Sequence, residues 1–203
     1  MVSSNDLRTA SLRERIRALE VDLMASPMRH YIYNDLPFAI FCYEPRDEWA
    51  MRREISLLTT RLEKGTNRRV VSISLADLLS QSVDESEGME AISALERQSG
   101  FEAAQRQVQD YLSDRDWRPL PELLSTRLAS LDPDRHLVFV VRAASLAPNL
   151  YRVSKLLDEM KGRTKVPCVL FMPATTEGSG SLRFMGIAEN EGRGSYHTKV
   201  YTE

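Results

Sequence analysis

Three short apolar runs constrain the fold of this chain more than any other feature of its sequence. They are Phe38–Tyr43, Leu137–Val141 and Val166–Met172. A short run that is apolar throughout is typical of a strand buried on both faces, as the strands of parallel sheets are. The sequence therefore predicts a parallel sheet that helices cover on both faces.

The segments between these runs predict the helices of such a sheet. Arg69–Leu75 alternates and is rich in β-branched residues, so it predicts a further strand. Before it, apolar residues recur at helical spacing at Met51, Ile55, Leu58 and Leu62. A second helix is expected between Leu137–Val141 and Val166–Met172, with Ser145 as its N-cap. Both strand–helix–strand units indicate parallel strands joined by right-handed crossovers.

The remaining segments complete the predicted architecture. Ser11–Glu14 has the form of a capping box and predicts the start of a first helix. Residues 84–131 are polar with helical periodicity, and predict a helical insertion. Leu182–Ile187 and Tyr196–Tyr201 are strand-like, and the acidic-then-glycine link between them favours an antiparallel C-terminal edge. We expect one α/β domain over residues 1–203, mostly parallel in its sheet.

Composition excludes several classes of function. The net charge is -2, so no overall positive field attracts nucleic acid or an anionic membrane. The best basic patch, Lys64 with Arg68 and Arg69 beside the first helix, lacks the interleaved aromatic residues that stack bases. No apolar stretch approaches the roughly 20 residues of a membrane span. Cys42 and Cys168 lie inside apolar runs, as buried thiols of a reducing compartment do. A soluble, cytoplasmic protein is expected.

Ligands of such sheets bind beyond the carboxyl ends of the strands, so the loops there are the candidate sites. The loop after Tyr43 lacks the glycines and lysine of a phosphate-binding loop, and Asp47 instead complements the helix dipole. Arg142 and Ser145 follow the third strand and could hold an anion or a partner's carboxylate. The alternative is that Arg142 pairs with a nearby acid while Ser145 only caps its helix. Arg183 follows a flexible Ser/Thr/Gly loop and could reinforce an interaction there.

Patterns for metal binding and nucleophilic catalysis are not found. His30, His136 and His197 have no second ligand at helical spacing, and the two cysteines lack zinc spacing. No nucleophile elbow is present. We therefore predict no catalytic residue, no metal and no cofactor.

The arrangement of these blocks resembles the BrxB family, which is found in BREX phage-resistance systems. The likeness extends from Leu12 to Tyr201. The segments that carry it are Phe38–Tyr43 with Pro45–Glu48 after it, Val70–Leu79, Leu137–Val141, Leu146–Leu157, Val166–Phe171 with Pro173, and Leu182–Phe184. Two places depart from the family pattern: Ala174 follows Pro173 where the family has glycine, and Ser195–His197 replaces a Tyr-Tyr-Arg-like signature.

The resemblance implies an accessory subunit that works beside the phosphatase-like PglZ protein, a methyltransferase and ATPase subunits. It supplies no catalytic residue. Asp47, Pro173 and Arg183 match motif positions, and with Arg142 and Ser145 they form the predicted interaction surface. Two other functions stay open: a degenerate nucleotide-binding or ATP-hydrolysing P-loop-like domain, and a nucleic-acid-binding module. Fold alone hosts many functions and does not decide among them.

Overall fold

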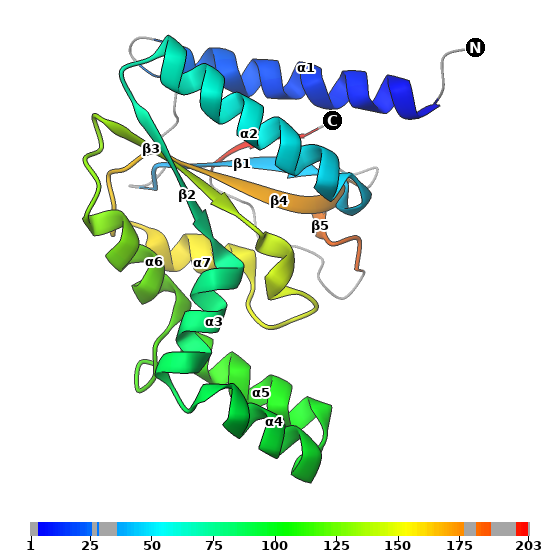
Figure 1. Ribbon diagram of the computed structural model, residues 1–203, viewed down its shortest axis with the longest axis vertical. Coiled ribbons are helices and arrows are strands. Elements are labelled where there is room, and N and C mark those ends of the chain that lie inside the picture. Colours follow the sequence, from blue (N-terminus) through cyan, green and yellow to red (C-terminus); the bar gives the residue numbers. More distant parts are fainter. Residues whose placement is uncertain (1–3, 26–27, 29–35, 177–181, 188–197, 203) are drawn as a thin grey trace.

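A six-stranded sheet forms the centre of the molecule (Figure 1). The computed structural model describes residues 4–25, 28, 36–176, 182–187 and 198–202, and the side chains from residue 11 onward. The strands are β1 (Phe38–Tyr43), β2 (Arg69–Ser74), β3 (His136–Val141), β4 (Cys168–Thr176), β5 (Leu182–Phe184) and β6 (Lys199–Tyr201). Their order is β2-β3-β4-β1-β6, and β5 pairs with β4 off this path.

Parallel pairing prevails, so the predicted fold class is confirmed. β1 runs beside β4 from the pair Phe38 and Cys168 to the pair Tyr43 and Pro173. β2 runs beside β3 over its whole length, and β6 is parallel to β1. The antiparallel pairing at the C-terminal end joins β5 to the extension of β4, and not to the final strand. Ser195–His197 lies outside the described residues.

Two long helices cover one face of the sheet. They are α1 (Ser4–Met24) and α2 (Glu48–Gly65), the latter preceded by the 3-10 turn η1 (Pro45–Asp47) (Figure 1). Leu19, Leu58 and Phe171 are fully buried in the apolar cluster between these helices and the sheet. Because α1 already begins at Ser4, the predicted helix start at Ser11 is wrong. The capping-box pattern lies inside a longer helix.

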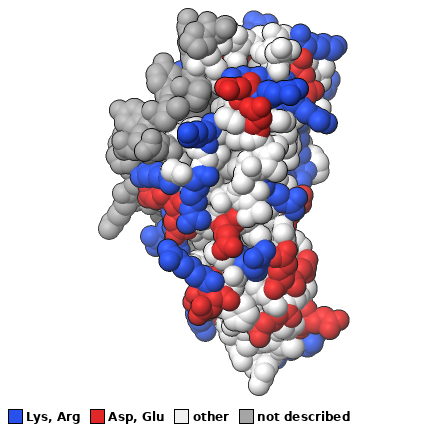
Figure 2. Space-filling view, turned by 90° about the vertical axis from the view of Figure 1, so that its left-hand side faces the viewer, with Lys and Arg blue, Asp and Glu red and all other residues white. Residues whose placement is uncertain are grey.

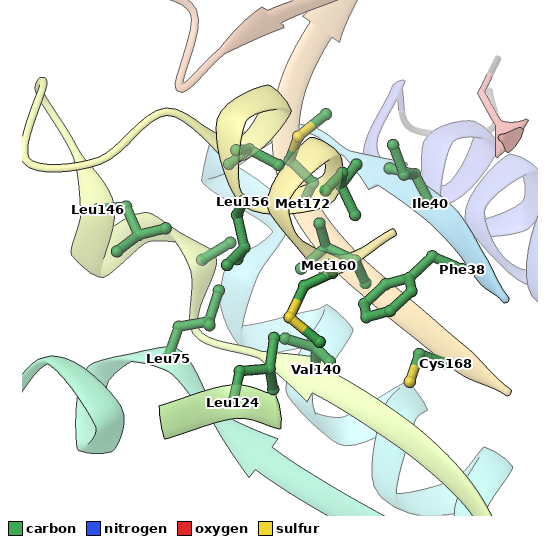
Figure 3. Packing of buried hydrophobic residues seen from close by; sticks show 14 of the residues in the cluster. Phe38, Ile40, Leu75, Leu124, Val140, Leu146, Leu156, Met160, Cys168 and Met172 are labelled. Carbon is green, nitrogen blue, oxygen red and sulfur yellow. The ribbon is translucent and has the colours of Figure 1, made fainter. Parts of the chain in front are cut away.

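Shorter helices cover the other face: α3 (Leu75–Glu85), α6 (Leu120–Ala129) and α7 (Val153–Met160), with the 3-10 turn η2 (Ala143–Leu146). Figure 3 shows how Leu124, Leu156 and Met160 from these helices converge on Val140 and Phe38 of the sheet. Burial of each such side chain stabilises the fold by about 1.5–3 kcal/mol, and both sheet faces gain in this way.

The helix expected from Ser145 starts later than predicted. Residues 143–146 form η2, and α7 begins only at Val153 after Arg152. Pro148 explains the interruption, because it lacks an N–H and disfavours helical backbone at the residue before it. The hydroxyl of Ser145 donates to the carbonyl oxygen of Arg142 at 2.9 Å, so it fastens the turn and caps no α-helix.

The predicted helical insertion contains a hairpin of α4 (Gly88–Ser99) and α5 (Phe101–Ser113), which projects away from the sheet (Figure 1). Its own buried cluster consists of Val83, Ile92, Ala104 and Tyr111. Ser82 of α3 is fully buried, and its hydroxyl donates to the carbonyl of Arg118 at 2.7 Å. That contact links the end of α3 to the segment that leads into α6.

Candidate functional site

The carboxyl ends of the strands and the first turns of α2 enclose a pocket of about 390 Å³, here called the strand-end pocket. Parallel pairing brings the ends of β1, β2 and β3 to the same side of the sheet, which is where ligands of such sheets bind. The pocket is lined by Tyr43, Glu48, Met51, Arg52, Ile55, Ser72, Ser74, Asp77, Val141, Arg142 and Phe171.

A short chain of hydrogen bonds fixes one wall of this pocket. The hydroxyl of Tyr43 donates to Glu48 at 2.5 Å, and the Nε of Arg52 donates to the other carboxylate oxygen at 2.8 Å. Burial and the Glu48 carboxylate hold the pKa of Tyr43 well above its usual value, although the charges of Arg52 and Arg142 oppose the shift. Tyr43 therefore stays protonated at neutral pH, and Glu48 is already engaged by two donors.

Trp49 stands at the edge of the same wall. Its side chain is 76% exposed, and the guanidinium of Arg52 lies 4.4 Å from the ring centroid. A cation over an aromatic face stabilises the pair and limits its conformational freedom. The result is an ordered, solvent-facing pair of the two residue types most enriched at interface hot spots.

Arg142 forms the opposite side of the pocket with an unusual backbone. Its φ and ψ of 64° and 34° lie in the left-handed region, which glycine adopts more easily than other residues. Its side chain is exposed, and no ion pair joins it to an acid among the residues that the structure describes. The expected alternative, a pair between Arg142 and a nearby acid, is therefore wrong for the described part of the chain.

Of the predicted surface residues, only Arg142 lines the pocket. Asp47 lies in η1, where its backbone N–H donates to the carbonyl of Glu44 at 2.8 Å and its side chain caps nothing. Pro173 is buried in β4 beside Tyr43, and its carbonyl accepts from Met185 at 2.9 Å. Both positions thus shape the end of β1 from outside the pocket.

Arg183 and Ser145 lie apart from the pocket lining as well. Arg183 is in β5 opposite Thr175, and Thr175 lines a second hollow of about 160 Å³ on another side of the end of β1. Ser145 lies in η2 and acts on Arg142 only through the backbone carbonyl. The predicted residues thus surround one end of the sheet but do not converge on one cavity.

Sequence reasoning missed the residues that build the wall: Tyr43, Trp49 and Arg52. Among the acids after Tyr43 it singled out Asp47, whereas the structure engages Glu48 in the hydrogen bonds described above. A usable signal was present, since Glu48 and Arg52 are four residues apart on a helix and such pairs face each other. The tyrosine partner had no signal, because only the fold turns the last residue of β1 toward α2.

Cys42, Cys168 and His136 do not line the strand-end pocket. Burial raises the pKa of Cys42 to about 12 and raises that of Cys168 as well, so both predicted buried thiols stay protonated. His136 is held in a turn, where its Nδ1 accepts from the N–H of Asp132 at 3.0 Å. Among the described residues, no three His, Cys, Asp or Glu side chains gather as metal ligands.

Comparison with known families supplies the identity. The sequence model of the family described as BREX protein BrxB matches residues 71–198. The chain belongs to the BrxB family. BrxB membership makes it a component of a BREX phage-resistance system, as the resemblance had predicted.

The BrxB match includes Arg142, Ser145, Pro173 and Arg183, while Asp47 and the Tyr43–Arg52 wall precede it. A search of curated proteins gives no match. Within the described residues, no helix is long and apolar enough to cross a membrane.

Proposed function

We propose that this BrxB protein is a non-catalytic adaptor that docks another BREX component in the cytoplasm, the phosphatase-like PglZ protein in the first place. The docking surface of this proposal is the strand-end face, defined as the strand-end pocket together with Trp49, Asp47, Ser145 and Arg183, with the buried Pro173 shaping it from within. Catalysis is left to the partner.

One observation carries the proposal: Trp49 is exposed and is held by Arg52, which lines the pocket. Covering a large exposed aromatic side chain removes apolar surface from water, which is favourable, and tryptophan and arginine dominate the energetics of many interfaces. The cation–π contact orders both side chains before binding, which lowers the entropy that docking would cost.

The engaged state of the polar groups also supports an adaptor. Tyr43 and Glu48 satisfy each other, and the two thiols are buried. A general acid or base needs a pKa near the working pH, whereas burial and Glu48 move that of Tyr43 upward and away from neutrality.

Nucleotide binding is the second candidate, since the pocket has the size of a small-ligand site and contains Arg142. Glu48 and Asp77 place carboxylates in the same lining, so Arg52 and Arg142 cannot also offset the several negative charges of a triphosphate. A thermal-shift scan with millimolar ATP and magnesium separates the two functions, because binding to the folded state raises the melting midpoint. No shift is expected, and a shift of several degrees would favour the nucleotide site.

Nucleic-acid binding is the third candidate. Figure 2 shows blue and red side chains interspersed over the visible side of the molecule, with no continuous basic band. Mixed charge of this kind offers a phosphate backbone little net attraction. An affinity for DNA or RNA that fell steeply with salt would overturn this ranking.

Co-expression with each BREX component, followed by affinity capture in mild salt, tests the adaptor. The wild type is expected to retain PglZ, and Trp49→Ala to retain at least tenfold less. Phe101→Ala is the matched control, because this aromatic residue is also exposed, at 62%, but lies on the α4–α5 hairpin. Failure of the wild type to retain any component contradicts the proposal, and loss with Phe101→Ala alone moves the docking surface to the hairpin.

A further inference from the structure

We infer that Arg142 is the recognition residue of the strand-end face, and that it binds the carboxylate of a glutamate side chain that the docked partner inserts into the strand-end pocket. This inference rests on the adaptor function proposed above and names the group that the site takes.

The backbone conformation at Arg142 indicates that the turn itself does not require an arginine side chain. Both the N–H and the hydroxyl of Ser145 donate to the carbonyl of Arg142, at 3.1 and 2.9 Å, and these bonds fix the turn from β3 into η2. The turn demands a positive φ, which glycine adopts without strain and arginine does not. Strain of this kind concentrates at functional positions.

The charges of the pocket leave Arg142 available. Two acids share the lining, Glu48 and Asp77. Glu48 is held by Tyr43 and Arg52, and neither acid lies within the 4.0 Å of an ion pair with Arg142. A guanidinium offers two parallel N–H donors that fit a carboxylate, so the pocket presents donors to one negatively charged acceptor.

The apolar part of the lining selects the aliphatic portion of the side chain that carries this carboxylate. Met51 and Phe171 are buried and form an apolar floor, to which Ile55 and Val141 add. Ser72 and Ser74 add hydroxyls at the rim. A methylene stem packs on such a floor while its carboxylate reaches Arg142, which fits glutamate better than the shorter aspartate.

The test compares variants of Arg142 in capture of PglZ by the full-length chain, with titration at two salt concentrations. Arg142→Gly relieves the backbone strain, and is expected to melt at or above the wild-type temperature while binding at least tenfold more weakly. Arg142→Gln keeps the stem and removes the charge, so its affinity is expected to fall similarly and to lose most of its salt dependence. Arg142→Lys keeps the charge, so it is expected to bind more weakly than the wild type but more tightly than Arg142→Gln.

The controls separate this inference from the adaptor function. Arg106→Ala removes one positive charge from an exposed site on α5 and is expected to bind as the wild type does. Arg142→Glu is expected to regain binding when one partner glutamate is changed to lysine. Wild-type affinity in the Gly and Gln variants, or a lowered melting temperature in both, overturns the recognition role but leaves the adaptor standing. A wild type that retains no partner overturns both.

Discussion

The sheet and the α4–α5 hairpin each bury a tyrosine whose hydroxyl donates to a glutamate, but the surroundings of the two residues differ. Tyr43 belongs to the large apolar cluster under α1 and α2, whereas Tyr111 belongs to a small cluster with Val83, Ile92 and Ala104. The stability available to each region follows from the apolar surface that it buries. Burial in the sheet therefore offsets the backbone strain at Arg142, while the stability of the hairpin depends on very few side chains.

The largest expected effect separates global from local unfolding. Phe139→Ala empties a fully buried position between Leu137 and Phe171, and is expected to cost about 3–5 kcal/mol of global stability. Tyr111→Ala is expected to open the hairpin while the sheet stays folded. Hydrogen exchange checks this: the second variant should lose protection in α4 and α5 only. Equal loss of protection in β3 and β4 would show that hairpin and sheet unfold as one unit.

The next effect concerns the turn of the hairpin. Gly100 has a φ of +85° and open space around its Cα, so Gly100→Ala is strained by conformation alone and is expected to cost about 1–3 kcal/mol. Gly65→Ala is the contrasting change, since its new Cβ would meet only the flexible end of the Met24 side chain, with the terminal methyl at 2.8 Å and Sδ at 3.5 Å. That methyl can move, so we expect a change within about 0.5 kcal/mol in urea unfolding. If Gly65→Ala lost more stability than Gly100→Ala, side-chain contact and not backbone conformation would be the stronger constraint on these glycines.

The pH dependence compares the two tyrosines directly. Burial and a glutamate raise the pKa of both, for Tyr111 to about 12, so each keeps its proton in the folded state at a pH where the unfolded chain loses it. Their stabilisation is complete below about pH 10 and declines above it, by up to about 1.4 kcal/mol per pH unit for each group. Tyr43→Phe is expected to flatten the fall of stability between about pH 10 and 11.

Urea midpoints across that range, measured for Tyr43→Phe, Tyr111→Phe and the wild type, provide the check. If the hairpin opens independently, Tyr111→Phe leaves the global midpoint unchanged at every pH. A slope that Tyr43→Phe does not alter would mean that the Tyr43 hydroxyl ionises as readily in the folded protein as in the unfolded chain.

The smallest effects test the helix starts that flank the strand-end pocket. Ser74 accepts from the N–H of Asp77 at 3.2 Å, so Ser74→Ala is expected to cost about 1 kcal/mol. Asp47 makes no such bond and acts only through the helix dipole, so Asp47→Ala is expected to cost about 0.5 kcal/mol or less. Thermal melting in low and high salt distinguishes them, because only the loss from Asp47 should shrink as salt rises.

The sequence was sufficient for the sheet because apolar runs such as Leu137–Val141 can only be satisfied by burial on both sides. It was insufficient where local signals compete. Ser145 resembles an N-cap, but Pro148 delays the helix, and Ser11 resembles one inside a helix that begins earlier. At the site, Arg142 was found by its place after a strand. Trp49 and Tyr43 were missed because exposure and side-chain direction arise only from tertiary packing.

The bond from Ser82 to the carbonyl of Arg118 has a consequence for how this chain tolerates changes in length. It joins the end of α3 to the start of the α6 segment, so the two points between which the hairpin is inserted are already neighbours. The tip of the hairpin around Gly100 can therefore change in length without moving a strand, whereas Leu112 of α5 packs in the main core and has to stay.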